Sequence, residues 1–276
     1  MISSELRRLC EEATQEIADY SVGFARLWEG DDQFDAQVAG SGTLIAAAGT
    51  HAILTADHVL EKLPTRGQIG LLLPTRFAAK VERHTVEVEF LEKVRIPRGT
   101  RDSDGPDIGV LILPAPLVGT IKSIKSFCNL LKWRDQVLPN PPSVDVGVWC
   151  LSGWAHEWTT DGHLERGFEK VKEFRGGCGW GTVTGERTRD GWDFLEFRAA
   201  YNKDYEGPES FQGFSGGGLW QLVTDTVGGG MRVTQRLLSG VAFYESPREE
   251  SQRVIVCHGR NSVYRNIIDA LRNRGS

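Results

Sequence analysis

Residues 209–217 read Glu-Ser-Phe-Gln-Gly-Phe-Ser-Gly-Gly, and the fold and the chemistry of the chain are best inferred from this stretch. Its serine, Ser215, stands between Gly213 and the pair Gly216 and Gly217. Because glycine has no Cβ, the backbone around this serine can turn tightly and approach a bound substrate closely. A serine hydroxyl is a weak nucleophile alone, and it needs a base and a group that orients the base. The stretch therefore predicts a partner histidine and a partner carboxylate elsewhere in the chain.

A candidate base and a candidate acid precede the serine. His58 lies within residues 54–59, Leu-Thr-Ala-Asp-His-Val, and Asp107 opens the apolar run at 107–113. His58 would take the proton of Ser215 as its Oγ attacks a carbonyl carbon, and Asp107 would hold the other ring nitrogen. The backbone N–H groups of Gly213 and Ser215 would bind the resulting oxyanion. The three residues together predict nucleophilic catalysis.

Three stretches resemble motifs of the trypsin-like serine proteases, which have the chymotrypsin fold. Residues 55–58 resemble the family's Thr-Ala-Ala-His, residues 107–111 its Asp-Ile-Ala-Leu-Leu, and residues 212–217 its Gln-Gly-Asp-Ser-Gly-Gly. The order His, Asp, Ser along the chain is the order found with this fold. Asp102 and Asp104 compete with Asp107 for the role of the acid, but neither opens an apolar strand.

The resemblance implies an all-β fold of two antiparallel six-stranded β-barrels with a short N-terminal helix and a C-terminal helix. Short β-rich runs separated by turn residues agree with it, as do the 32 glycines. We expect a helix at 1–19, a first barrel at 20–138 that carries His58 and Asp107, a second barrel at 139–261 that carries Ser215 and the specificity pocket, and a helix at 262–276. The proline-rich stretch at 139–142 is the expected linker.

Composition narrows the environment and the partners. The net charge of −5 argues against a nucleic-acid partner, and no apolar stretch has transmembrane length. The first residues lack the apolar core of a signal peptide, and the five cysteines show no metal-ligand spacing. Where secreted members of the family carry two cysteines, this chain has Val59 and Phe211. We therefore expect a cytoplasmic protein of the bacterial intracellular type, without a metal or another cofactor and without a membrane partner.

Substrate preference is predicted from the resemblance. In the family, the residue six places before the serine forms the floor of the pocket for the side chain that precedes the cut. Glu209 occupies that place, which implies cleavage after Arg or Lys through charge pairing. Residues 240–245 resemble the strand that pairs with the substrate, so Phe243, Tyr244 and Glu245 are expected to bind it. A solvated Glu209 in a polar loop is the alternative interpretation.

The glycines around Ser215 also fit a second class of enzymes with a catalytic triad. Gly213, Ser215 and Gly217 match the nucleophile elbow of α/β-hydrolases, and Asp225 and His258 follow in the right order. An elbow needs a buried strand before the serine and a helix after it. The polar residues before the serine and the glycines after it do not fit, so this alternative is rejected.

The chain is thus expected to be a serine endopeptidase that hydrolyses peptide bonds through an acyl-enzyme. Its partners would be a protein or peptide substrate and a regulatory protein. Phe214 stands where zymogen-activated members of the family have an aspartate, so activity is expected without N-terminal trimming. Family-level analogy allows a role as an effector in a bacterial stress or defence system. The alternative is a catalytically inactive protease-like module that binds a protein partner.

Overall fold

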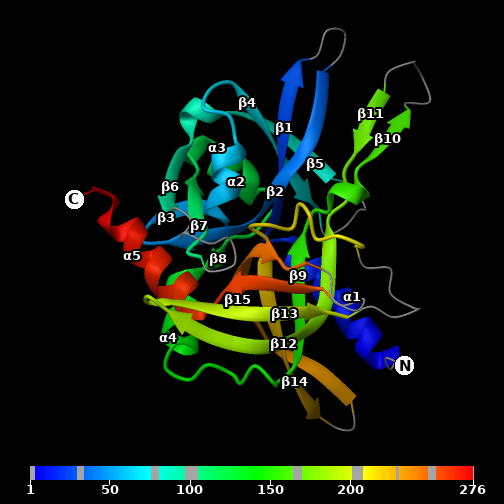
Figure 1. Ribbon diagram of the computed structural model, residues 1–276, viewed down its shortest axis with the longest axis vertical. Helices are drawn as coiled ribbons and strands as arrows, with labels where there is room; N and C mark the ends of the chain where they lie inside the picture. Colours follow the sequence, from blue (N-terminus) through cyan, green and yellow to red (C-terminus); the bar gives the residue numbers. More distant parts are fainter. Residues whose placement is uncertain are drawn as a thin grey trace.

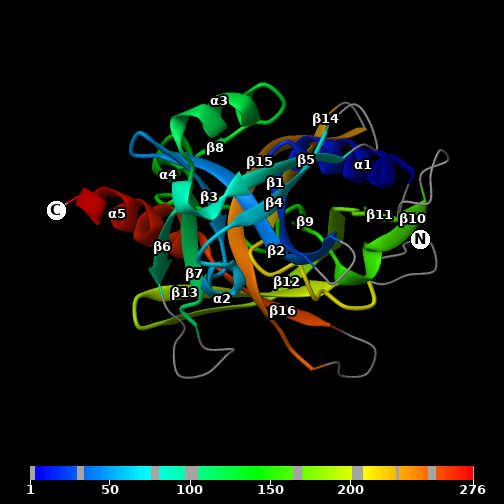
Figure 2. The same ribbon diagram turned by 90° about the horizontal axis from the view of Figure 1, so that it is seen from above.

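The computed structural model describes residues 4–29, 34–75, 81–96, 105–163, 170–200, 208–227, 230–247 and 253–275. The chain is mostly β-structure, with a helix near each end, as expected (Figure 1). The two termini lie on opposite sides of the molecule in both perpendicular views (Figures 1 and 2). No helix in these ranges is both long and apolar enough to cross a membrane. Asp102 and Asp104 lie outside the described residues.

The elements of the first half are α1 Ser4–Ala18, β1 Ser21–Glu29, β2 Phe34–Ala47, β3 Thr50–Thr55, α2 Asp57–Lys62, β4 Gln68–Pro74, β5 Val81–Glu87, η1 Val88–Phe90, β6 Glu92–Ile96, β7 Ile108–Ile112, α3 Ala115–Lys122, β8 Cys128–Asn129 and α4 Leu130–Val137. Those of the second half are β9 Val148–Gly153, η3 His156–Trp158, β10 Thr160–His163, β11 Lys170–Glu173, β12 Gly177–Arg189, β13 Trp192–Ala199, β14 Gly218–Val227, β15 Gly230–Glu245, β16 Val254–His258, η4 Ser262–Asn266, α5 Ile267–Arg272 and η5 Asn273–Gly275.

The first sheet has eight strands, where six were expected. Its order is β5-β4-β1-β2-β3-β7-β6, and β8 pairs with β2 in parallel. The difference has two causes. Two strands, β5 and β6, separated by the 3-10 turn η1, stand where one strand was expected at 85–95, and Cys128–Asn129 adds a short strand. Because β5 and β6 are the two ends of the hydrogen-bonded path and are joined by this short turn, the sheet must curl until its ends meet at η1.

The register of two neighbouring strands brings two chain segments together at one edge of this sheet. β3 and β7 are antiparallel, and Thr55 at the end of β3 lies opposite Gly109 near the start of β7. The chain enters α2 directly after β3, and it enters β7 directly after residue 107. His58 and Asp107 are therefore neighbours in space because the register of β3 and β7 makes them so.

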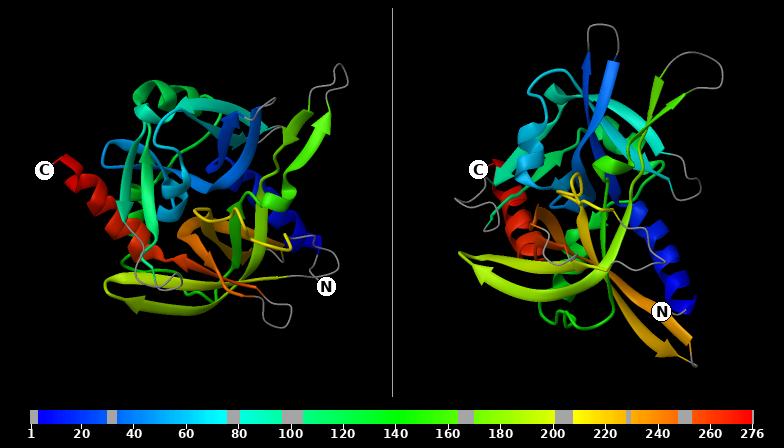
Figure 3. Two further views of the ribbon diagram at one scale, coloured as in Figure 1. Left: turned by 45° about the horizontal axis from the view of Figure 1, so that its top comes forward. Right: turned by 45° about the vertical axis from the view of Figure 1, so that its right-hand side comes forward.

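The second sheet is a closed ring of six strands in the order β12-β13-β16-β15-β14-β9. The hairpin of β10 and β11 is separate from this ring and projects on the same side of the molecule as the β1–β2 hairpin (Figures 1 and 3). An ion pair of 3.6 Å between Lys172 Nζ and Asp35 Oδ1 links the two hairpins. The β10–β11 hairpin, which lies between β9 and β12 in the sequence, therefore contacts the first sheet through this ion pair.

The terminal helices pack on the sheets through apolar faces. Ala13 and Ile17 of α1 are buried, and Glu5 accepts a hydrogen bond of 2.8 Å from the backbone N–H of Met231 in β15. In the C-terminal helical segment, Ile268 and Leu271 are buried in the same core cluster as the α1 residues. Two further helices were not expected, because only strands and a linker were predicted there. Helix α3 follows β7, and helix α4 follows β8. One apolar core thus joins both sheets and the two ends of the chain.

Candidate active site

His58 and Asp107 form a buried, doubly hydrogen-bonded pair. His58 Nδ1 lies 2.7 Å from Asp107 Oδ2, and the backbone N–H of His58 donates to Asp107 Oδ1 at 2.9 Å. Only 6% of His58 and 1% of Asp107 is exposed. A carboxylate accepts hydrogen bonds, so the contact places the ring proton on Nδ1 and leaves Nε2 as a proton acceptor. This is the arrangement that a general base requires.

A second buried carboxylate fixes the start of the helix that carries His58. Asp57 accepts two hydrogen bonds from Arg95, of 2.7 Å from Nε and 2.8 Å from Nη2. This hydrogen bonding raises the pKa of Arg95. Bidentate pairs of this kind fix orientation as well as distance. The first turn of α2 is thereby tied to β6, on which Arg95 lies.

The turn that contains Ser215 is fixed to the strands that lead to His58. Ser41 N–H on β2 donates to Ser215 O at 2.8 Å. Gly216 has φ +85°, and a Cβ there would lie 2.0 Å from Thr55 Oγ1 and 2.1 Å from Ser41 O. Only glycine fits this close approach. Because Thr55 ends the strand before His58, the serine turn and the base lie side by side.

Two peptide groups around Ser215 direct their N–H groups away from the protein's own acceptors. Gln212 O accepts from the backbone N–H of His156 at 2.9 Å, and Phe214 O accepts from that of Gly217 at 2.8 Å. In a trans peptide the C=O and the following N–H point in opposite directions. Neither the N–H of Gly213 nor that of Ser215 donates a hydrogen bond within the described part of the chain. Both predicted oxyanion donors are therefore available.

Ser215 is half-buried, and its Oγ makes no hydrogen bond with any described residue. The same holds for Nε2 of His58 among residues that the structure describes. In enzymes, the contact between nucleophile and base is often long until substrate binds. The structure thus places the base and the nucleophile on adjoining segments without a direct bond between them.

The predicted pocket floor is in a different environment from the one expected. Glu209 is exposed, because its loop is held at the surface by another carboxylate. Glu157 accepts from the backbone N–H groups of Glu209 at 2.7 Å and of Ser210 at 3.2 Å. This exposure agrees with the alternative of a solvated Glu209 in a polar loop, and contact of Glu209 with a substrate stays a prediction. No sequence signal identified Glu157, an exposed residue of a short 3-10 turn.

Glu245 connects the end of β15 to the loop before the serine. Its carboxylate accepts from Ser210 Oγ and from the backbone N–H of Phe211, both at 3.3 Å, and it pairs with Arg253. The carboxylate of Glu245 was expected to bind the substrate, and this stays a prediction. It spans the gap between the two segments, and Arg253 neutralises its charge.

The side chain of Phe243 points into the core. It is buried, and its ring centroid lies 4.6 Å from that of His258 and 6.0 Å from that of Phe194. The register of β15 shifts between Ala242 and Tyr244, which changes the alternation of side chains there, and Tyr244 is half-buried. Pairing of this strand with a substrate backbone stays a prediction.

His258 is the residue that sequence reasoning missed. The backbone N–H of Asp107 donates to His258 Nε2 at 2.9 Å, and His258 is fully buried. It was weighed only as the histidine of an α/β-hydrolase, and that class stays rejected because a strand, β14, follows Ser215 instead of a helix. A contact between residues so far apart in the chain leaves no local pattern in the sequence.

One cavity lies beside the candidate active site. One of about 310 Å³ is lined by Trp28, Gln37, His156 and Lys172 among others, between the two projecting hairpins. This cavity lies next to Gly213, one of the two predicted oxyanion donors, because a Cβ at Gly213 would lie 3.0 Å from Cδ2 of the lining residue His156.

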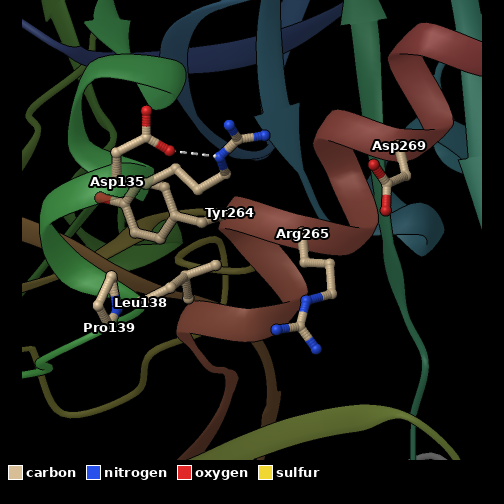
Figure 4. Close-up of a pocket in the computed structure, with 7 residues that line it drawn as sticks. Asp135, Leu138, Pro139, Tyr264, Arg265 and Asp269 are labelled. Carbon is tan, nitrogen blue, oxygen red and sulfur yellow. Dashed lines mark hydrogen bonds and ion pairs between the residues drawn. The ribbon is translucent and has the colours of Figure 1, made fainter.

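Another cavity, of about 280 Å³, lies between α4 and the C-terminal helical segment and is lined by Arg134, Asp135, Leu138, Pro139, Tyr264, Arg265 and Asp269 (Figure 4). None of these residues belongs to the predicted triad. Two of the lining residues, Arg134 and Asp135, form an ion pair, which Figure 4 draws as a dashed line from Asp135.

Within the described ranges, no group of three or more His, Cys, Asp or Glu side chains is placed to hold a metal ion. The sequence matches no protein-family model and no curated protein. The chemistry of the site is therefore inferred from its own geometry.

Proposed function

We propose that the protein is a trypsin-like serine endopeptidase with the triad Ser215, His58 and Asp107. In this proposal, the curled first sheet and the closed ring of six strands are the two β-barrels of a chymotrypsin-like fold. The observation that carries it is the contact of both Asp107 carboxylate oxygens with His58, beside a serine turn that is bonded to β2. Buried carboxylate–imidazole pairs next to a serine between glycines serve nucleophilic catalysis.

The reaction would proceed in two halves. His58 Nε2 takes the proton of Ser215 as Oγ attacks the peptide carbonyl carbon, and Asp107 stabilises the imidazolium that forms. The N–H groups of Gly213 and Ser215 stabilise the oxyanion, and His58 then protonates the leaving amine. Water attacks the acyl-enzyme in the second half, with His58 again as the base.

Substrate preference depends on the loop before the serine and on the end of β15. We propose that the substrate side chain that precedes the cleaved bond lies between the 209–212 loop and the end of β15. Backbone N–H groups of this loop donate hydrogen bonds to the carboxylates of Glu157 and Glu245. A preference for Arg or Lys would then depend on the acidic surroundings of this loop, including the exposed Glu209. Cleavage of a peptide library tests the preference for Arg or Lys. A preference for apolar side chains before the cleaved bond would refute it.

Location and partners are also proposals. All five cysteines lie within the described residues and none is in a disulfide, which supports a reducing compartment such as the cytoplasm. The substrate would be a protein or peptide, with a second protein as regulator, in a bacterial stress or defence system. Comparing the proteins cleaved in cells that express the active chain with those in cells that express Ser215→Ala would identify the substrate.

A second candidate is an inactive protease-like module that binds a protein partner. One observation favours it, which is that Ser215 Oγ is not hydrogen-bonded to any described residue. A fluorophosphonate probe separates the two candidates, because it reacts with an activated serine. The endopeptidase should be labelled and Ser215→Ala should not. An unlabelled wild type, with its folded state verified, would favour the binding module.

A further inference from the structure

His258 occupies a closed aromatic site directly behind the catalytic acid. Its ring centroid lies 5.6 Å from that of Trp192, 5.2 Å from that of Phe194 and 4.6 Å from that of Phe243. A Cβ at Gly105 would lie 3.3 Å from His258 Cε1, so the segment before Asp107 also closes over the ring. Nδ1 of His258 has no partner among the described residues. The single polar contact of this ring within the described structure is the one with Asp107.

The direction of that contact determines the protonation state of the ring. The backbone N–H of Asp107 is the donor, so His258 Nε2 must be an unprotonated acceptor and the ring proton must lie on Nδ1. Burial lowers the pKa of His258 to about 4, although the carboxylates of Asp107 and Asp193 act in the opposite direction. His258 is therefore neutral at neutral pH, and a neutral ring is the only form that can make this bond.

The same pair of strands holds the nucleophile. His258 on β16 lies opposite Val241 on β15. The next residue, Ala242, accepts from Gly216 N–H at 2.7 Å and donates to Gly217 O at 2.9 Å. Asp107, by contrast, precedes a strand of the first sheet. His258 thus connects Asp107, at the edge of the first sheet, to β15 of the second sheet, whose Ala242 is hydrogen-bonded to the serine turn.

We propose that His258 is a positioning residue for the triad, which holds the Asp107 main chain so that both carboxylate oxygens meet His58. This inference rests on the proposed function. Without the acceptor, a buried N–H group would lose its partner and the segment before β7 would shift to find another. The expected consequence is a misplaced imidazole and a slower chemical step, with substrate binding unchanged.

Three substitutions test the acceptor separately from the packing. His258→Phe keeps an aromatic ring and removes the acceptor, whereas His258→Gln keeps an acceptor at nearly the same reach. His258→Asn is polar but too short to reach Asp107, so it covers the case in which His258→Phe does not fold. We expect His258→Phe and His258→Asn to lower kcat about 10- to 100-fold, the scale of one buried unpaired donor, at unchanged KM. His258→Gln should stay within about threefold of wild type.

Proton NMR gives a readout that does not need catalysis. The downfield resonance of the His58 Nδ1 proton should persist in wild type and in His258→Gln, and it should shift or broaden in the other two variants. Equal loss of kcat in His258→Gln and His258→Phe, a loss confined to KM, or an unchanged resonance in His258→Phe would overturn the inference. If wild type neither cleaves peptides nor reacts with a fluorophosphonate, the proposed function fails, and the resonance alone still decides the role of His258.

Discussion

The two halves of the candidate site are held by different kinds of bond. On the acid–base side, side chains contact one another or a main chain from the other sheet, as in His58 with Asp107 and Asp107 with His258. On the nucleophile side, Ser215, Gly216 and Gly217 are held by bonds between backbone groups, while Ser41 Oγ donates to Gly213 O at 2.7 Å. The turn fits only because its glycines lack Cβ atoms. The comparison teaches that the first half should be sensitive to a change of functional group. The second half should be sensitive to added atoms.

Removing the nucleophile should have the largest effect. Ser215→Ala deletes the attacking oxygen, and turnover should fall by about 10⁴- to 10⁶-fold, the scale known for serine-protease triads. Hydrolysis of a peptide that the wild type cleaves measures this. Ser123→Ala is the matched control, since that exposed hydroxyl donates to Thr120 O at the end of α3, outside the candidate site. Turnover that survives in Ser215→Ala would remove the nucleophile from the account.

On the acid–base side, Asp107→Asn changes one functional group and almost no volume. An amide cannot fix the imidazole in the required tautomer, so kcat should fall by about 10⁴-fold. Asp57→Asn is the control on the neighbouring carboxylate, because it weakens the pair with Arg95 without touching the ring of His58. It should lower stability and leave kcat within about tenfold of wild type. Equal losses of kcat in both variants would break the proposed contrast.

On the nucleophile side, Gly216→Ala adds a Cβ into space occupied by Thr55 Oγ1 and Ser41 O. The clash and the positive φ should lower the free energy of unfolding by about 2–4 kcal/mol. Gly49→Ala is the matched control, since its φ is +77° and nothing lies within 4 Å of an added Cβ. That variant should lose only about 1 kcal/mol. Chemical denaturation measures both, and equal losses would show that the close contact contributes nothing.

The pH dependence of stability sharpens the account of His258. Its pKa is lowered by burial from the ordinary value of 6.5 to about 4, so the unfolded chain binds more protons than the folded one between these values. Stability from this group is therefore fully present above pH 6.5 and is lost as the pH falls toward 4. The loss in the wild type should be on the order of 3 kcal/mol. In His258→Gln, the decline in unfolding free energy over this interval should be smaller, and an identical decline would contradict a neutral buried ring.

Sequence reasoning succeeded where a local pattern carries the structure. The β-rich character and the helix near each end could be predicted, since strand and helix patterns are local. The neighbouring positions of His58 and Asp107 were predicted from the resemblance of their surrounding motifs to a known family, and the two residues are in contact. The division of β5 from β6 was missed, because residues 81–96 contain no Gly, Pro, Asn, Asp or Ser that would mark a turn.

The sequence does not reveal features that a tertiary contact decides. Glu209 lies in a loop whose backbone is bound by Glu157, which is distant in sequence. The ring of Phe243 packs against that of His258, beside a register shift in β15. His258 was overlooked because its bond to Asp107 spans 151 residues. Each of these depends on which segments meet after folding, and no pattern within one segment encodes that.

The most direct test of the central claim is the site and rate of phosphonylation by a fluorophosphonate, mapped by mass spectrometry in wild type and in His58→Ala. The account predicts that the adduct is on Ser215 in the wild type and that its formation is slower by orders of magnitude without the imidazole. An adduct on a different residue, or an equal rate in His58→Ala, would contradict the claim that His58 activates Ser215.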